Sequence, residues 1–205
     1  KQYPIALIDE FQDTDPVQYR IFARLYPADA EQHLACFMIG DPKQAIYSFR
    51  GGDIFTYLKA HQATQGRHYT LNTNFRSTQA LVQAVNQVFL QAEMQQSTGA
   101  FCFKTTDDNP LPFHAVDAKG RNEIWLDNLN AAAALTLWQM PADSAIGMPD
   151  YRRQMADATA SEIVRLLQSA DQNRTGFQSP SGEIRHLQPA DIAILVRSGG
   201  EAKAM

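Results

Sequence analysis

Two carboxylates, one amide and one arginine stand out in this sequence as side chains that could act on a phosphate group. Asp9 and Glu10 directly follow the apolar run Ile5–Ile8. An acid at the end of a strand can hold Mg²⁺, and a neighbouring carboxylate can deprotonate an attacking water. The amide of Gln44 is suited to contact a γ-phosphate, and Arg76 could neutralise charge on a transferred phosphoryl group. These residue types point to nucleotide hydrolysis.

Four further side chains could contact a nucleic-acid base or strand. Tyr47 and Phe49 offer π faces and Arg50 a cation, which is how proteins hold single strands without reading their sequence. Phe75 could stack on a base or pack under the helix that follows it. Each candidate also has an ordinary structural explanation. The acid pair could cap a helix or lie in a solvated turn, Arg76 could form a surface ion pair, and the aromatic residues could belong to the core.

Short apolar runs and a helical pattern must position these side chains. The run Ile5–Ile8, ended by acids, predicts a buried parallel strand, and Ala35–Ile39 predicts a buried neighbour. Between them, Asp15 followed by Pro16 predicts the start of a helix. Strand, helix and strand in this order predict a right-handed parallel crossover. Ligands of such α/β sheets bind at the carboxyl edge of the strands.

The rest of the chain predicts further elements with a scaffold role. Asp53 can cap a helix that starts at Ile54, and Ser77 or Thr78 can cap a longer one. Residues 91–122 show no clean period and are expected to form a loop and insertion. The remaining expectations are strands at His68–Leu71, Ala134–Met140 and Asp191–Arg197, a helix over Tyr151–Ala170, an ambiguous stretch at Asn130–Ala133, a polar and turn-rich stretch at 171–188, and a helix starting near the end of the chain.

Composition places the chain among globular proteins. Hydrophobic residues make up 44% of the 205 residues, and 18 Lys and Arg oppose 22 Asp and Glu for a net charge of −4. This balance lacks the basic surface of a self-sufficient nucleic-acid-binding domain, so DNA contact would depend on a few placed residues. Cys36 and Cys102 fit neither a disulfide framework nor a zinc site, which suits a cytoplasmic protein. No apolar run is long enough for a membrane span, and the missing initial Met suggests an excised fragment.

Four segments, in this order, resemble motifs of the superfamily 1 UvrD/Rep-type DNA helicases. The combination is far more specific than any one motif. Within that family, Asp-Pro-Lys-Gln before the aromatic residues and Arg-Gly-Gly-Asp-Ile after them are most similar to the RecB-like branch, the beta subunits of exodeoxyribonuclease V. The four segments are Leu7–Thr14, Ile39–Asp53, Asn74–Ser77 and Asp191–Ser198.

The resemblance implies an α/β fold, a partial parallel-sheet RecA-like (P-loop NTPase) helicase core with an insertion. Residues 1–66 would form the C-terminal half of the first RecA-like domain. Residues 67–205 would begin the second, with the insertion at about 91–150. The implied cofactors are ATP and Mg²⁺, and the two domains would close on ATP between them.

The resemblance also implies roles for individual residues around the nucleotide. Asp9 would coordinate Mg²⁺ through water, and Glu10 would activate the attacking water. Gln44 would sense the γ-phosphate. Arg76 would act across the domain cleft as an arginine finger, and Phe75 would stack on adenine.

The implied partner is DNA. Tyr47, Phe49 and Arg50 match the family segment that contacts single-stranded DNA. The whole protein would unwind and degrade double-stranded DNA ends in recombinational repair, together with the gamma and alpha subunits of exodeoxyribonuclease V, and no membrane partner is implied.

One departure from the family pattern concerns the phosphate cradle. The sequence contains no Gly-x-x-x-x-Gly-Lys-Ser/Thr, and the late helicase motifs and the carboxylate-rich nuclease domain are also missing. We therefore expect these 205 residues alone neither to bind ATP tightly nor to unwind or cut DNA, whereas the parent protein would. Two alternatives stay open, a UvrD-like repair helicase without a nuclease and a non-catalytic scaffold remnant.

Overall fold

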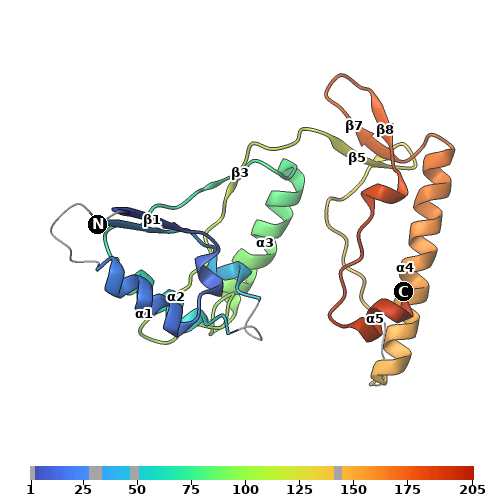
Figure 1. Ribbon diagram of the computed structural model, residues 1–205. Helices are drawn as coiled ribbons and strands as arrows, with labels where there is room; N and C mark the ends of the chain where they lie inside the picture. The colour runs from blue at the N-terminus through green and yellow to red at the C-terminus, as the bar shows by residue number, and fades with distance from the viewer. Residues whose placement is uncertain (1–2, 28–33, 47–50, 141–144) are drawn as a thin grey trace. The chain divides into compact units, whose positions relative to one another are not determined.

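The computed structural model describes residues 3–27, 34–46, 51–140 and 145–205. They form a mixed α/β structure with small sheets and two compact units (Figure 1). The first unit comprises Lys1–Leu71 and Phe89–His114, and the second comprises Asn72–Val88 and Ala115–Met205. Of the helices in these described ranges, none is both long enough and apolar enough to cross a membrane.

A parallel strand pair with a connecting helix builds the first unit. Strands β1 (Ile5–Ile8) and β2 (Ala35–Met38) pair in parallel, and α1 (Pro16–Leu25) lies between them in the chain. The predicted strand, helix and strand are therefore confirmed. Asp15 starts α1 with a capping box, accepting hydrogen bonds from the amides of Val17 and Gln18 at 2.7 and 2.9 Å.

The turn after β1 is anchored in the core by one aromatic side chain. Phe11 begins the short helix η1 (Phe11–Asp13) and is 2% exposed. Its ring contacts Tyr19 of α1 and Tyr57 of α2 (Ile54–Ala63), with centroids 6.0 and 6.2 Å apart. This packing fixes the backbone that directly follows Asp9 and Glu10. The predicted cap at Asp53 is confirmed, because its carboxylate accepts the Phe55 amide at 3.1 Å.

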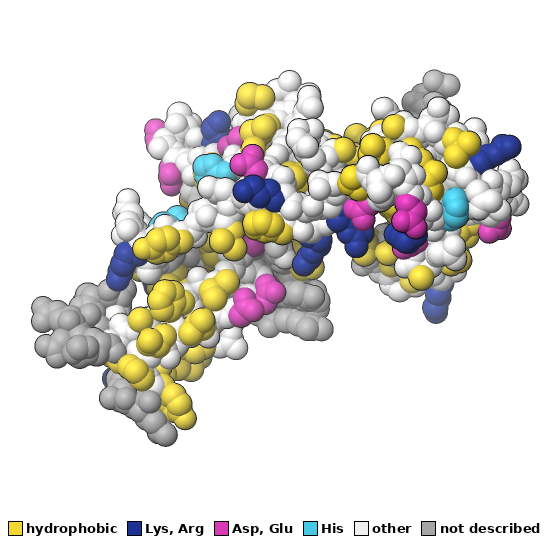
Figure 2. All heavy atoms as spheres, turned by 90° about the horizontal axis from the view of Figure 1, so that it is seen from above, with side chains coloured by type: hydrophobic (Ala, Val, Ile, Leu, Met, Phe, Trp, Pro, Cys, Tyr) yellow, Lys and Arg dark blue, Asp and Glu magenta, His cyan; other side chains and the backbone are white. Residues whose placement is uncertain are grey.

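The β1–β2 sheet is covered on one side only. Helices α1 and α2 lie on the same side of it (Figure 1). On the other face Ile5, Leu7 and Phe37 are 56, 69 and 54% exposed. The prediction of fully buried strands is therefore wrong, because the described sheet has two strands and a single covering layer. Figure 2 shows hydrophobic side chains gathered at the surface of the molecule.

The second unit starts with a short parallel pair and a long helix. Strands β3 (Thr73–Asn74) and β4 (Asp117–Ala118) pair in parallel. Helix α3 (Gln79–Gln95) follows β3 and extends into the first unit. Of the two predicted caps, Thr78 is the one used, since its hydroxyl accepts the Leu81 amide at 3.4 Å.

An antiparallel sheet and a long helix form the rest of the second unit. The strands lie in the order β6-β5-β7-β8. Leu126 and Thr175 are buried in this part, at 6 and 0% exposure, together with Ala156 and Ala170 of α4. The elements are β5 (Ile124–Asp127), β6 (Asn130–Ala131), α4 (Met148–Asp171), β7 (Gly176–Gln178), β8 (Ile184–His186), η4 (Pro189–Asp191) and α5 (Gly199–Ala204).

Several predictions for this later part need correction. The predicted helix over Tyr151–Ala170 is confirmed as α4, and the helix near the end is α5. The strands predicted at His68–Leu71, Ala134–Met140 and Asp191–Arg197 are wrong, because these segments pair with no strand in the described structure. The polar stretch predicted as turns contains the β7–β8 hairpin, and the ambiguous Asn130–Ala133 begins with β6.

Candidate functional site

The two parallel strands of the first unit end side by side. The Ile39 amide donates to the Ile8 carbonyl, and the Phe11 amide donates to the Ile39 carbonyl, both at 2.8 Å. The residues that follow β1 and those that follow β2 therefore meet at the same edge of the sheet. This is the edge at which α/β proteins bind their ligands.

Glu10 has an unusual backbone conformation at this edge. Its φ of 49° and ψ of 41° lie in the left-handed region, which costs a non-glycine residue roughly 1 kcal/mol or more. Its amide donates to the Asp9 carboxylate at 3.0 Å, and its carbonyl accepts the Asp13 amide at 3.0 Å. The side chains of Asp9 and Glu10 are both exposed. The structure thus presents two adjacent carboxylates to solvent on a turn that Phe11 holds in place.

A buried amide joins this turn to the loop after β2. Gln12 is 2% exposed, and its Nε2 donates to Glu10 Oε2 at 2.7 Å. Its Oε1 accepts the Asp41 amide at 3.0 Å. Gly40 makes this approach possible, because a Cβ built there would lie 2.6 Å from Gln12 Oε1.

Asp41 extends the connection to Gln44. One oxygen of Asp41 accepts the Lys43 amide at 3.0 Å and contacts Lys43 Nζ at 2.7 Å. The other accepts Gln44 Nε2 at 3.1 Å. Burial alone would raise the pKa of Asp41, but the hydrogen bonds from Lys43 and Gln44 outweigh it, and the pKa lies below the ordinary carboxyl value. Asp41 is therefore ionised at neutral pH, and a continuous set of hydrogen bonds runs from Glu10 to the exposed Gln44.

The second unit presents Phe75 and Arg76 on a tight turn. The side-chain oxygen of Asn74 accepts the backbone amides of Arg76 and Ser77, each at 2.9 Å. Phe75 is 72% exposed, so it does not pack under α3. Arg76 is exposed and forms no ion pair with any residue in the described part of the chain.

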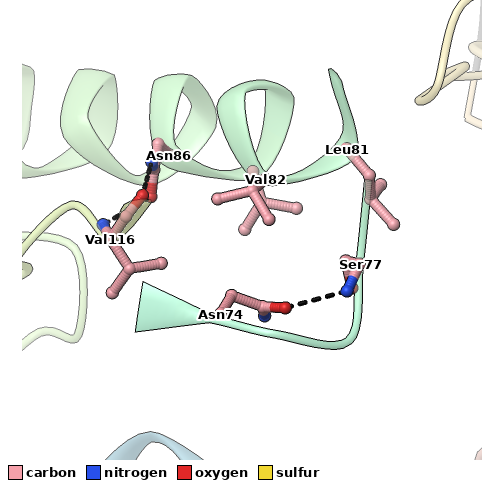
Figure 3. A pocket seen from close by; sticks show the side chains of 7 residues that line it. Asn74, Ser77, Leu81, Val82, Asn86 and Val116 are labelled. Atoms are coloured by element: carbon pink, nitrogen blue, oxygen red, sulfur yellow. Dashed lines mark hydrogen bonds between the residues drawn. The ribbon is translucent and has the colours of Figure 1, made fainter. Parts of the chain in front are cut away.

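A small pocket of about 130 Å³ lies beside this turn (Figure 3). The side chain of Asn86 on α3 bonds both backbone groups of Val116, donating at 2.9 Å and accepting at 3.3 Å. These bonds tie α3 to the segment that enters β4. The lining of the pocket is mostly apolar, which suits a structural gap better than a site for a polar ligand. The lining residues are Asn74, Ser77, Leu81, Val82, Val85, Asn86 and Val116.

The predicted site residues fall into three groups. Asp9, Glu10 and Gln44 share one edge of the first unit, whereas Phe75 and Arg76 belong to the second. Tyr47, Phe49 and Arg50 lie outside the described residues. No cluster of three or more His, Cys, Asp or Glu suited to a metal occurs in the described ranges. Mg²⁺ is often held by one or two carboxylates together with water and substrate phosphates, so the Asp9 and Glu10 oxygens fit that ion.

Comparison with known proteins assigns the first part of the chain. Residues 1–65 match the family model of the UvrD/REP helicase N-terminal domain. The described site of β1, η1, β2 and η2 (Pro42–Gln44) lies within the residues that this family model matches.

Relatives extend the similarity along almost the whole chain. It is 41% identical over 203 residues to the RecBCD enzyme subunit RecB of Escherichia coli K12, covering 98% of this chain and 16% of that subunit. It is 50% identical over 215 residues to the RecB subunit of Mycobacterium tuberculosis CDC 1551, covering 100% of this chain and 17% of that subunit. The RecB of Haemophilus influenzae is 40% identical over 201 residues, covering 98% and 15% respectively. The chain thus spans about a sixth of the length of these relatives.

Two residues of the described site were given no role on sequence grounds. Gln12 and Asp41 connect Glu10 to Gln44, and the bond between Gln12 and Asp41 depends on the two strand ends being adjacent. A signal for Asp41 was present, because an acid follows the second apolar run two residues after its end, as Asp9 directly follows the first. Gln12 carries no such signal, since its burial follows from tertiary packing.

Proposed function

We propose that this chain is part of the ATP-dependent motor of a RecB-like helicase and exonuclease subunit, which unwinds and degrades double-stranded DNA ends in recombinational repair. The observation that carries the proposal is the hydrogen-bonded connection from Glu10 to Gln44 at the carboxyl edge of β1 and β2. A base and a γ-phosphate sensor must act on the same phosphate, and a fixed connection between them suits that task. The similarity to RecB subunits supports the choice within the helicase family.

The residues of the first unit would divide the chemistry of hydrolysis. Glu10 would accept a proton from water as that water attacks the γ-phosphorus and the bond to the β–γ bridging oxygen breaks. Gln44 would contact the γ-phosphate or the water with its amide. Asp9 would hold Mg²⁺ through water, and that ion neutralises phosphate charge when bound.

The second unit would complete the site from another domain. Residues 1–66 would belong to the first parallel-sheet RecA-like domain, and 67–205 to the second, with an insertion at about 91–150. Arg76 would neutralise charge developing on the transferred phosphoryl group, and its exposure without an ion partner in the described structure leaves it free to do so. Phe75, equally exposed, would stack on adenine.

The remaining proposals concern DNA and partner subunits. Tyr47, Phe49 and Arg50 would contact single-stranded DNA through stacking and charge. The relatives are named as subunits of the RecBCD enzyme, and we extend this assembly, with its gamma and alpha subunits, to the protein that contains this chain.

Replacement of Glu10 by Gln in the full-length protein tests the proposed function. The substitution keeps size and removes the base, so kcat for ATP hydrolysis should fall at least about 100-fold while nucleotide affinity is retained. Glu183→Gln, at an exposed position of the β7–β8 hairpin, is the matched control and should leave kcat unchanged. Full hydrolysis by Glu10→Gln would refute the role of Glu10, and a wild-type protein without ATPase activity would refute the function.

A further inference from the structure

We propose that Gln12 is a positioning residue that couples the orientation of the Glu10 carboxylate to the position of the Gln44 loop. The inference rests on the proposed function and adds a residue to which no role in ATP hydrolysis has been given above. Its basis is the pair of hydrogen bonds that the two ends of one buried amide make to two different segments.

The orientation of the Gln12 amide follows from its partners. The Asp41 backbone N–H is a donor only, so the atom that faces it must be the amide oxygen. The NH₂ group then necessarily faces Glu10 Oε2, at 2.7 Å. A side chain that is only a donor, only an acceptor or apolar cannot make both bonds.

Burial makes this connection costly to break. Gln12 is 2% exposed, so water does not replace the bond between its Oε1 and the Asp41 amide when that bond is lost. On the other side, Nε2 has only a long contact of 3.5 Å with Asp13 Oδ2 besides its bond to Glu10. The bond to Glu10 is also charge-assisted, which fixes one rotamer of the carboxylate.

The connection continues beyond Asp41 to the sensor. The same residue whose backbone donates to Gln12 uses its carboxylate to hold Gln44 Nε2 at 3.1 Å. A shift of the Gln44 side chain on γ-phosphate binding or release therefore moves Asp41. Through Gln12 it changes the orientation of the Glu10 carboxylate. The base is held in its active orientation when the sensor loop is in place.

Two substitutions of Gln12 in the full-length protein test this coupling. Gln12→Met keeps the length and removes both bonds, so kcat of DNA-stimulated ATP hydrolysis should fall about 10–100-fold, as when partners that orient reacting groups are lost. KM for ATP and the Kd of a fluorescent ATP analogue should stay within about twofold. Gln62→Met, at an exposed position on α2, is the matched control and should behave as wild type.

Gln12→Glu separates positioning from folding. It keeps the acceptor for the Asp41 amide but loses the donor that holds the Glu10 carboxylate. The kcat should therefore fall as in Gln12→Met, while KM for ATP and the Kd of the ATP analogue stay within about twofold. If Gln12 served only to hold the Asp41 loop, Gln12→Glu would keep the wild-type kcat.

The outcomes are distinct. If wild type hydrolyses ATP while Gln12→Met keeps its kcat, or while Gln12→Glu binds the ATP analogue with the wild-type Kd and keeps its kcat, the coupling is overturned and the proposed function stands. If wild type shows no DNA-stimulated ATPase activity, both the proposed function and the coupling are refuted. Should Gln12→Met not fold, the kcat of Gln12→Glu, measured together with its nucleotide Kd, decides.

Discussion

At the scale of single residues, one glycine sets how closely the two strand ends approach. A Cβ at Gly40 would lie 2.6 Å from Gln12 Oε1, 3.0 Å from the Gln12 amide and 3.1 Å from the Phe11 amide. Two of these three neighbours are backbone atoms that cannot rotate away. The spacing between the Glu10 turn and the Asp41 loop thus depends on the absence of a side chain at position 40.

We expect Gly40→Ala to separate the two segments, at a local cost of about 1–3 kcal/mol from overpacking. Hydrogen exchange in peptides covering residues 9–14 and 39–45 should accelerate, and kcat for ATP should fall as in Gln12→Met. The two substitutions combined should cost less than the sum of each, because both break the same connection. Gly199→Ala, where nothing lies within 4 Å of the added Cβ, is the control, and additive effects would contradict the account.

Phe75 offers a second test at this scale. Phe75→Ala should raise KM for ATP about 2–10-fold with little change in kcat, because a lost aromatic stack costs roughly 0.5–1.5 kcal/mol of nucleotide binding. Phe75→Trp should retain affinity. Tyr69→Ala removes another highly exposed aromatic side chain and should have no effect on steady-state kinetics. An unchanged KM in Phe75→Ala would remove Phe75 from the nucleotide site.

Residue types alone identified Asp9, Glu10, Gln44 and Arg76 as candidates, because acids after a strand and an arginine before a helix are local patterns. They could not identify Gln12. Its role depends on contact with Asp41, 29 positions away in the sequence, and on burial by packed helices. A glutamine considered in the sequence alone reveals neither its long-range contact nor its burial.

At the scale of elements, helices were predicted well and strands poorly. Asp15, Asp53 and Thr78 start helices through contacts within a few residues, so their signals are complete in the sequence. Strands need partners. The apolar runs Ala134–Met140 and Asp191–Arg197 have strand composition but pair with no described strand, whereas the polar β7–β8 segments pair through a tight turn.

One arginine joins α4 to β5 in the second unit. Arg165 donates from two nitrogens to Asp127 at 2.9 and 2.7 Å and also pairs with Glu162. These hydrogen bonds hold the pKa of Asp127 and that of Glu162 below their ordinary values. Their contribution to stability is therefore fully present above the unfolded carboxyl pKa of about 4, and it is lost as pH falls from there through the lower pKa of each carboxyl in the folded state.

Arg165→Met should weaken the contact between α4 and β5 at pH 7 by roughly 0.5–1 kcal/mol, since the pair is partly exposed. Its effect should fade at about pH 3. The measurement is pulsed hydrogen exchange of α4 peptides at one common pH after incubation at each test pH in moderate urea. Arg153→Met, which loses an exposed i,i+3 pair on the same helix, is the control. A destabilisation by Arg165→Met that persists unchanged at pH 3 would contradict the pKa directions.

At the scale of the whole molecule, the proposed site draws on both units. Asp9, Glu10 and Gln44 belong to one, and Phe75 and Arg76 to the other. The 205 residues also lack the glycine-rich phosphate cradle and span about a sixth of their relatives. Activity is therefore a property to be measured on the full-length protein.

Arg76→Ala in that protein should lower kcat for ATP hydrolysis about 10³-fold or more while nucleotide affinity changes little, the result expected if Arg76 is an arginine finger. Arg76→Lys should have a kcat nearly as low as that of Arg76→Ala, because an ammonium group lacks the planar arrangement of guanidinium donors. Arg174→Ala, at an exposed arginine of the same unit, should match wild type. A kcat unchanged by Arg76→Ala would place the finger elsewhere.

The most direct test is a structure of the full-length protein with Mg²⁺, ADP and a γ-phosphate transition-state mimic. The account predicts that Glu10, Gln44 and Arg76 each lie within about 3.5 Å of the mimic or its attacking water, with Asp9 beside the metal. Side chains that point at separate regions of the protein would contradict it.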